Sequence, residues 1–320
     1  MDPLSDVLRA VRLNGAFFYV FEGIAPWSIS VAPARELVPR VLPEAEHLMA
    51  YHIVTEGSCW IGCAGEPQEE LHLGDGILFP HGDAHLASAE RGKGDGRRYN
   101  HAPSRPLERI RLGTGPGARV DLVCGFLGCD ARPYNPLLAA LPRSVVIRGI
   151  ASGWLAEFPR QVVAEAWQNR AGGGTMLTRM AELMFVEVVR RYSEELPPRQ
   201  AGWLAGLRDP LVAAALAELH AHPAHPWTLA ALARVVATSR TVLSERFTQT
   251  VGLPPMQYLT EWRLQLAAEQ LAGGSKKVAA VAAEVGYESE AAFSRAFKRR
   301  TGHAPAGWRR MRQNGDAIPA

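Results

Sequence analysis

The chain has 320 residues, enough for two domains of ordinary size. Hydrophobic residues make up 47% and charged residues 21%, values of a globular protein that exclude a wholly disordered or fibrous chain. No apolar run approaches the roughly 20 residues that cross a bilayer. The acidic N-terminus lacks the positive charge of a signal peptide, so we expect a cytoplasmic protein with no membrane partner.

The net charge of +3 is unevenly distributed along the chain. Residues 209–312 contain 13 Lys and Arg against 8 Asp and Glu, whereas the remainder is slightly acidic. A basic segment beside an acidic one suggests a module that binds a polyanion, attached to a part with another task. Charge alone does not decide this, because such an excess lies within ordinary variation.

Residues 1–150 alternate between short apolar runs and turns rich in Gly and Pro. The runs at 17–21, 27–31 and 52–54 are examples, and turn signals such as Gly74-Asp75-Gly76 separate them. Many short strands at this spacing predict an all-β barrel or sandwich.

From about residue 152 the apolar residues recur at helical steps. Met176, Met180, Leu183 and Met184 fall on one face of a predicted helix. This face would form either a dimer surface or the core of one protomer.

The expected fold class is α+β, in four segments. Pro197-Pro198 ends the first helical part, because proline cannot continue a helix. We expect a β-rich domain over 1–150, a helical linker or dimerisation segment over 151–205, an all-α domain over 206–312 and a disordered tail over 313–320.

The all-α part contains an internal repeat with an offset of 50 residues. The residues that match are Ala233 and Ala283, Ser239 and Ser289, Leu243 and Phe293, Ser244 and Ser294, Phe247 and Phe297, Gly252 and Gly302, Pro255 and Pro305, and Tyr258 and Trp308. Each copy predicts a helix, a tight turn and a second helix capped by a serine, which is a helix-turn-helix.

The second helix of each copy divides cleanly into two faces. Leu243 and Phe247 face the core in the first copy, and Phe293 and Phe297 do so in the second. The opposite faces carry small polar groups and cations, which suit a helix that enters the major groove of DNA. Basic residues expected to neutralise phosphates flank these helices: Arg240, Lys276, Lys277, Lys298, Arg299 and Arg300.

Residues 233–267 and 281–309 resemble the AraC/XylS transcription regulators. The stretches that carry the resemblance include Tyr258-Leu259-Thr260-Glu261-Trp262 and Val285-Gly286-Tyr287. The resemblance implies two helix-turn-helix units joined by a helix over about 255–271, with double-stranded DNA and RNA polymerase as partners and a homodimer as the assembly. It also implies the base-contacting positions Thr241, Ser244 and Glu245 in the first unit, and Glu290, Ala291, Ser294 and Arg295 in the second.

Residues 74–85 resemble the second cupin motif, with His85 at its metal-ligand position. The first cupin motif is degenerate, because Ala50 stands where a glutamate is expected and no His-x-His precedes it. A catalytic metal needs a complete ligand set with an open position. We therefore expect a sensor barrel and no enzyme, with a metal-dependent cupin enzyme carrying a helical appendage as the rival reading.

His52, His85 and Cys124 form a candidate metal site. His52 lies two residues after Ala50 and so shares its strand face, and Cys124 lies on a later predicted strand. Two imidazoles and a thiolate would suit zinc, although no cofactor is required by the motif. The alternative, which we favour, is three ordinary semi-buried residues.

The four cysteines offer a second hypothesis, a thiol-based oxidant sensor. Cys59 and Cys63 share one face of a predicted strand but lie too far apart to bond. Cys124 and Cys129 flank a turn-like Gly125-Phe126-Leu127-Gly128 that would bring them together. The sequence thus predicts a DNA-binding transcription regulator whose barrel senses a small molecule, a metal or an oxidant. Activator is the expected class, although the residues do not distinguish activation from repression.

Overall fold

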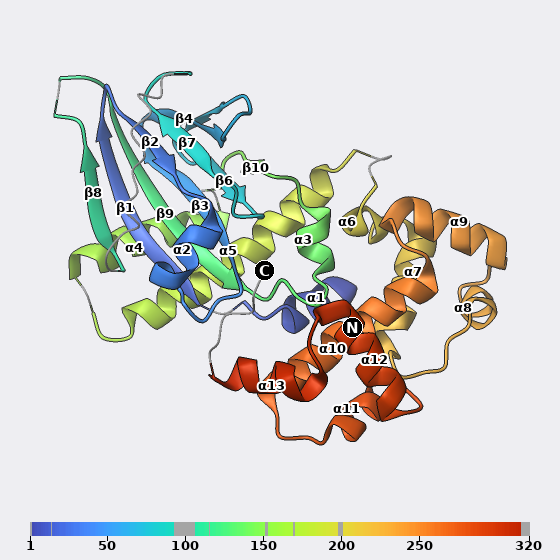
Figure 1. Cartoon of the computed structure of the whole chain (residues 1–320). Helices are drawn as coiled ribbons and strands as arrows, with labels where there is room; N and C mark the ends of the chain where they lie inside the picture. The colour runs from blue at the N-terminus through green and yellow to red at the C-terminus, as the bar shows by residue number, and fades with distance from the viewer. Residues whose placement is uncertain are drawn as a thin grey trace. The chain divides into compact units, whose positions relative to one another are not determined.

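The computed structural model describes residues 2–13, 15–92, 106–114, 116–150, 153–168, 170–197 and 201–314 (Figure 1). The chain forms two compact units that are not contiguous in sequence. The β-rich unit comprises Leu13–Cys129 and Leu141–Glu195, and the helical unit comprises Met1–Arg12, Asp130–Ala140 and Leu196–Ala320. Among the described residues, no helix combines the length and apolarity that spanning a membrane requires.

The β-rich unit contains two facing sheets. A six-stranded sheet has the order β10-β6-β3-β9-β1-β8, and a four-stranded sheet has the order β2-β7-β4-β5. All neighbouring strands pair antiparallel except β1 and β8, which are parallel. The strands are β1 (Ala16–Ile24), β2 (Ser28–Val31), β3 (His47–Glu56), β4 (Ser58–Cys63), β5 (Glu69–His72), β6 (Gly76–Phe79), β7 (His85–Ser88), β8 (Glu108–Leu112), β9 (Arg119–Cys129) and β10 (Val145–Ile147).

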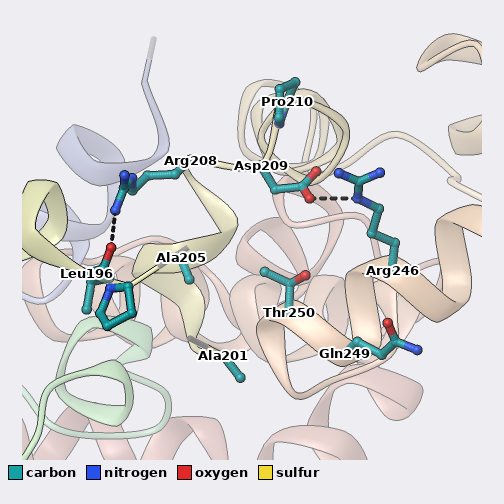
Figure 2. Close-up of a pocket in the computed structure, with 10 residues that line it drawn as sticks. Leu196, Ala201, Ala205, Arg208, Asp209, Pro210, Arg246, Gln249 and Thr250 are labelled. Atoms are coloured by element: carbon teal, nitrogen blue, oxygen red, sulfur yellow. Dashed lines mark hydrogen bonds and ion pairs between the residues drawn. The ribbon is translucent and has the colours of Figure 1, made fainter. Parts of the chain in front are cut away.

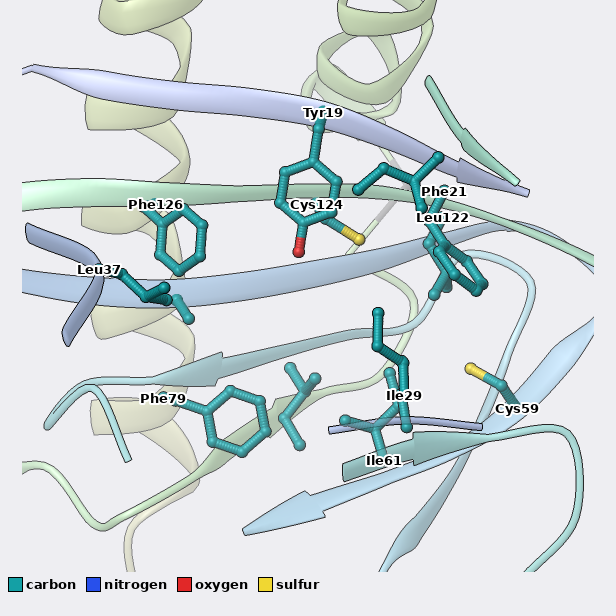
Figure 3. Close-up of a cluster of buried hydrophobic side chains, with 14 of the residues drawn as sticks. Tyr19, Phe21, Ile29, Leu37, Cys59, Ile61, Phe79, Leu122, Cys124 and Phe126 are labelled. Atoms are coloured by element: carbon teal, nitrogen blue, oxygen red, sulfur yellow. The ribbon is translucent and has the colours of Figure 1, made fainter. Parts of the chain in front are cut away.

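Alternate residues of each strand fill the space between the sheets. Leu122, Cys124 and Phe126 of β9 point inward to meet Ile29 and Ile61 from the other sheet (Figure 3). The intervening residues of β9 are buried as well, because helices cover the outer face of the six-stranded sheet. Burial on both faces explains why β9 is apolar almost without interruption.

The covering helices are α4 (Glu157–Gln168) and α5 (Gly173–Glu195). Two further helices belong to this unit: α2 (Ala34–Val41) precedes β3 in sequence, and the short 3-10 helix Gly153–Ala156 precedes α4. Met184 is 2% exposed and packs inward, whereas Met176 is 38% and Leu183 55% exposed. The apolar residues predicted to share one face of α5 therefore divide between two faces. One face packs against the sheet, and the other is exposed to solvent.

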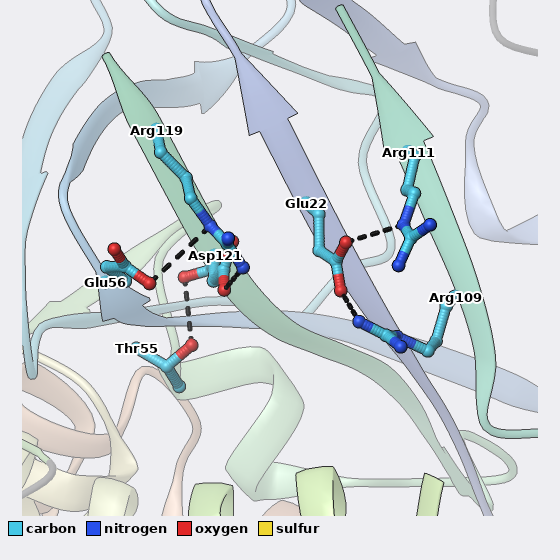
Figure 4. Close-up of polar contacts among 7 residues, drawn as sticks. All are labelled: Glu22, Thr55, Glu56, Arg109, Arg111, Arg119 and Asp121. Carbon is cyan, nitrogen blue, oxygen red and sulfur yellow. Dashed lines mark hydrogen bonds and ion pairs between the residues drawn. The ribbon is translucent and has the colours of Figure 1, made fainter. Parts of the chain in front are cut away.

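Ion pairs on the outer face of the six-stranded sheet hold its edge strand in register (Figure 4). Glu22 of β1 accepts from both Arg109 and Arg111 of β8, with the Arg111 Nε at 2.7 Å. Arg119 binds Asp121 on the same strand at 2.6 Å. Because Glu22 and Asp121 lie directly opposite each other, each carboxylate needs its own arginine.

The helical unit contains two helix-turn-helix pairs, α8 with α9 and α11 with α12, joined by α10. Its helices are α1 (Pro3–Ala10), α3 (Pro136–Ala140), α6 (Trp203–Gly206), α7 (Pro210–Ala221), α8 (Leu229–Val235), α9 (Arg240–Val251), α10 (Pro255–Gly273), α11 (Val278–Glu284), α12 (Glu290–Thr301) and α13 (Pro305–Asn314). Ser239 and Ser289 cap α9 and α12 by accepting from Val242 and Ala292 N–H. At the start of the tail expected over 313–320, α13 continues to Asn314, and residues from 315 on lie outside the described residues.

The structure corrects the repeat register within the first helix of each pair. The residues of α8 and α11 correspond at an offset of 49, not 50. The reason is that the turn between α11 and α12 contains one extra residue, Glu288. Buried Ala233 therefore matches buried Ala282, while Ala283 is exposed. The turns match too, since Ala237 (φ 53°) and Gly286 (φ 87°) both adopt the left-handed conformation.

Two segments from the N-terminal half complete the helical unit. The side chain of Gln265 on α10 is 2% exposed and accepts from the Tyr134 N–H at 3.0 Å. Its amide also donates to the Ala10 carbonyl at 2.9 Å. Both partners lie outside the segment 206–312, so the boundaries expected from the sequence differ from the compact units.

Candidate functional site: two exposed recognition helices and a buried histidine pair

The outward face of α9 is where the sequence analysis places the first set of base-contacting residues. Leu243 and Phe247 are fully buried, which turns the opposite side of the helix to solvent. Thr241 and Glu245 are exposed and Ser244 is half-buried, so all three lie at the surface. The cap at Ser239 fixes where this surface begins.

The outward face of α12 is more basic than that of α9. Glu290, Ala291 and Arg295 are exposed and Ser294 is half-buried, behind a core of Phe293 and Phe297. Among the residues that the structure describes, none forms an ion pair with Arg295, Lys298 or Arg299. Three cations without a protein counter-ion favour an anionic partner for this helix.

The remaining cations expected to contact phosphates are all exposed but differ in their partners. Arg240 and Lys277 are exposed at the starts of α9 and α11. Lys276 binds Glu284 at 2.6 Å, and Arg300 binds Glu261 at 2.5 Å. These two pairs are at the surface, where such bonds are worth only about 0–1 kcal/mol and exchange easily for a phosphate.

Arg246 of α9 forms an ion pair with Asp209, the residue that caps α7. Its Nε donates to Asp209 at 2.6 Å, and the same carboxylate caps α7 by accepting from Leu211 and Val212 N–H (Figure 2). These bonds lower the pKa of Asp209 despite the opposing effect of burial. The pair borders a groove of about 500 Å³, and it leaves the first helix-turn-helix with fewer available cations than the second.

One exposed residue of α9, Val242, is not recognisable from the sequence pattern. Val242 is 46% exposed on the first turn of the helix, between Thr241 and the buried Leu243. An apolar side chain that folding leaves in solvent at such a place suits contact with a thymine methyl group or a protein partner. The sequence does not reveal this exposure, because Val242 is followed by the apolar Leu243 and the pattern predicts both side chains to be buried.

The structure brings His52, His85 and Cys124 together inside the barrel. His52 Nδ1 lies 2.9 Å from Cys124 Sγ, and His52 Nε2 lies 2.8 Å from His85 Nε2. All three side chains are buried, and His85 stacks on Phe79 with ring centroids 4.1 Å apart. They form a line with His52 in the middle.

The hydrogen bonds at the ends of this line fix its protons. His85 Nδ1 faces the Asp83 carbonyl at 3.0 Å and must donate to it, which leaves His85 Nε2 as an acceptor. His52 Nε2–H then donates to His85, and the Cys124 thiol donates to His52 Nδ1. Burial lowers the pKa of both histidines, that of His85 to about 4, and raises the pKa of Cys124.

The three residues do not form the three-donor zinc site that the sequence suggested. A metal ion needs its donors about 2.0–2.3 Å from one point. Cys124 and His85 face opposite edges of the His52 ring, so no point satisfies all three. Consistently, the described residues contain no group of three or more His, Cys, Asp or Glu arranged to hold a metal.

The prediction of a turn between Cys124 and Cys129 is wrong. Residues 125–128 continue β9 without interruption, paired with β1 and β3. Cysteines five apart on a strand point to opposite faces and lie about 17 Å apart, too far for a disulfide. None of the four cysteines is in a disulfide and all four are buried, with Cys59 and Cys63 on one face of β4 as expected.

Comparison with known proteins agrees with this architecture. A family model described as "Cupin" matches residues 2–194, and one described as "Helix-turn-helix domain" matches residues 232–311. An AraC-like transcription regulator of Streptomyces antibioticus is 32% identical over 97% of this chain and 99% of its own length. The transcriptional regulator AlkR of Acinetobacter baylyi is 27% identical over 97% of this chain and 100% of its own.

The chain belongs to the AraC-like transcription regulators, with a cupin domain followed by a DNA-binding helix-turn-helix domain. A solved structure of the AdpA DNA-binding domain, in complex with a target DNA, is 30% identical. It covers 33% of this chain and 96% of its own, with a TM-score of 0.32.

Proposed function

We propose that the protein regulates transcription by placing α9 and α12 in successive major grooves on one face of the DNA. The observation that carries this is the pair of capped helices of equal length, each with a fully buried aromatic core and a polar outer face. A helix of this kind fits a groove about 12 Å wide.

The residues proposed to read bases are Thr241, Ser244 and Glu245 on α9, and Glu290, Ala291, Ser294 and Arg295 on α12. Arg295 has the chemistry to donate twice to guanine, and the two glutamates accept from cytosine N4 or exclude other bases. Phosphates are proposed to bind Arg240, Lys276, Lys277, Lys298 and Arg299, which fix position without reading sequence.

We further propose that the protein is a cytoplasmic homodimer that activates transcription through RNA polymerase. The open face of α5 supports the dimer, because Met176 and Leu183 are exposed beside Arg179 and Glu182, which carry opposite charges. Leu183→Lys should shift the protein to a monomer in sedimentation equilibrium. Leu73→Lys is the matched control, since Leu73 is 68% exposed in the same unit, and equal shifts in both variants would contradict this interface.

A regulatory rather than catalytic barrel is supported by the incomplete ligand set. Ala50 stands where the acidic ligand is expected. The two buried histidines are hydrogen-bonded to each other and do not form, with Cys124, a three-donor metal site with an open position. The rival reading, a metal-dependent cupin enzyme, has no support in the arrangement of His52, His85 and Cys124. We propose that the barrel senses a signal.

The test is selection of binding sites from random duplex DNA by the full-length protein. Arg295→Ala should cost about 1–3 kcal/mol of affinity for the selected site. Arg160→Ala is the matched control, because Arg160 is also an exposed arginine but lies in the β-rich unit. Failure to select any sequence, or an equal loss in both variants, would overturn the proposal.

A further inference from the structure

Two imidazoles from opposite sheets face each other directly in the barrel. His52 lies on β3 of the six-stranded sheet, and His85 begins β7 of the four-stranded sheet. Their Nε2 atoms are 2.8 Å apart, with only one proton to share. Nitrogen atoms that point at one another in a buried interior have the orientation that a linear two-coordinate ion requires.

The other nitrogen of each ring already has a hydrogen-bonding partner. His85 Nδ1 donates to the Asp83 carbonyl, and His52 Nδ1 lies against Cys124 Sγ, which also hydrogen-bonds to the Tyr19 hydroxyl. Histidines that bind metals donate their second N–H to a carbonyl or an anion, which fixes the ring and raises its basicity. His85 meets this condition as it stands, and His52 meets it once the Cys124 thiol proton has moved to its Nδ1.

We propose that His52 and His85 bind one soft monovalent cation, of the copper(I) or silver(I) class, between their Nε2 atoms. Cys124 is a positioning residue here and not a ligand. This deepens the proposed sensing role of the barrel, but the site itself stands independently of DNA binding.

The exchange is balanced in charge. The cation replaces the proton on His52 Nε2, and the thiol proton of Cys124 moves to His52 Nδ1. One proton leaves the protein for each ion that enters, and the resulting thiolate accepts from His52 and from Tyr19. The buried interior therefore gains no net charge, which keeps the cost of desolvation low.

A divalent ion does not fit the same place. Zinc needs four ligands, and two neutral imidazoles with one thiolate beyond the ring would leave both its coordination and its charge unsatisfied. Phe79 and Ile77 of the surrounding core are apolar, and in the part of the chain that the structure describes no third His, Cys, Asp or Glu completes a metal site. The site therefore selects for low charge and low coordination number.

Binding also moves the two sheets. Two metal–nitrogen bonds of about 2 Å each place the nitrogens about 4 Å apart, so the rings must separate by roughly 1 Å. His85 can slide along the face of Phe79, on which it stacks at an interplanar angle of 10°. A displacement between β3 and β7 is the form in which the barrel would register the ion.

The experiment uses the full-length protein, reduced and free of chelator, titrated with silver(I) as a redox-inert probe. X-ray absorption at the silver edge should show one ion per chain with two nitrogen neighbours and no sulfur neighbour. This measurement on the native chain does not depend on whether any variant folds. A sulfur neighbour, or the absence of saturable binding, would overturn the proposal.

Variants separate the roles of the three residues. His52→Ala and His85→Gln should each abolish the two-nitrogen site, whereas the exposed His72 provides the control His72→Ala, which should leave it unchanged. Cys124→Ala should keep the stoichiometry and nitrogen shell but weaken affinity about 10–100-fold, as for a lost outer partner. Complete loss of binding in Cys124→Ala, or zinc binding of equal strength in the native chain, would contradict it.

Because DNA is absent from these assays, their failure leaves the proposed DNA binding untouched. Conversely, a protein that binds silver(I) as described but selects no DNA sequence would overturn the regulator proposal alone.

Discussion

The two helix-turn-helix units share their interior and differ at their surface. Phe247 packs against Tyr258 with ring centroids 5.7 Å apart, and Phe297 packs against Trp308 at the same distance. Both second helices begin at a serine cap and end at a glycine in the left-handed conformation, Gly252 or Gly302. The repeated residues are thus those that build the scaffold.

The residues that differ face outward. Arg295 and Lys298 of α12 correspond to Glu245 and Thr248 of α9, and Arg246 is held by Asp209. We infer that the second unit supplies most of the attraction to DNA and that the first supplies discrimination. An internal repeat thus separates structural from functional residues without any second sequence.

The largest expected effect tests whether the two cores are equivalent. Phe247→Ala and Phe297→Ala should each destabilise their own unit by about 3–5 kcal/mol, because both side chains are fully buried. Hydrogen exchange of α9 and α12 measures the two openings separately. Strong protection that survives in either variant would show that the cores are not equivalent.

Acid should lower the stability of the first helix-turn-helix unit relative to the second, by a smaller amount. Burial lowers the pKa of His220 to about 3, although Asp6 lies 3.7 Å away and Tyr258 Oη 2.7 Å away. The unfolded state takes up a proton near pH 6.5 and the folded state does not, so stability falls as the pH drops below 6.5. Trp308, which replaces Tyr258 in the second unit, has no such neighbour among the described hydrogen bonds.

The expected loss around α7 and α10 is about 3 kcal/mol between pH 7 and pH 4.5. Hydrogen exchange of these helices at both pH values measures it, and α12 serves as the internal reference. His220→Gln should remove this part of the pH dependence. An unchanged pH dependence in that variant would contradict the assignment.

Substitutions on the outer faces test the proposed division of labour. Arg295→Ala should cost about 1–3 kcal/mol of specific binding, and Lys298→Ala should lower the salt dependence by about one phosphate contact. Glu245→Ala should leave overall affinity nearly unchanged and broaden the selected sequence at one position. Fluorescence anisotropy at two salt concentrations distinguishes these results, and the account fails if Glu245→Ala lowers affinity as much as Arg295→Ala.

The two turns give the smallest difference. Ala237→Gly should stabilise the first unit by up to about 1 kcal/mol, because Ala237 holds a left-handed conformation that glycine adopts freely. Gly286→Ala should destabilise by more, since a Cβ there would lie 2.8 Å from the Ala224 backbone. Denaturant titration followed by exchange of α8 and α11 checks both, and equal effects of opposite sign would contradict the steric argument.

Much of the helical unit could be predicted from the sequence because its signals are local. Caps, helix periodicity and the spacing between Ser239 and Gly252 depend only on neighbouring residues, and the joining helix over about 255–271 matches α10. The extra Glu288 was invisible because alanines dominate both first helices, so either offset matches.

Long-range features lay beyond the sequence pattern. Gln265 reads as a surface residue of α10, yet its two partners come from chain segments more than 100 residues away. Likewise, Gly125 and Gly128 signal a turn locally, but β1 and β3 pair on either side and hold them in β9. That His52 and Cys124 meet follows from their pairing across β3 and β9, while the line they form with His85 depends on side-chain orientation.

DNA binding by both recognition helices is tested most directly by a footprint of the full-length protein on a duplex that it has itself selected. Two reading helices on one face of the DNA predict two protected major grooves about 10 base pairs apart, with the guanine contact in one of them lost in Arg295→Ala. Protection without sequence preference, or of one groove only, would contradict the account.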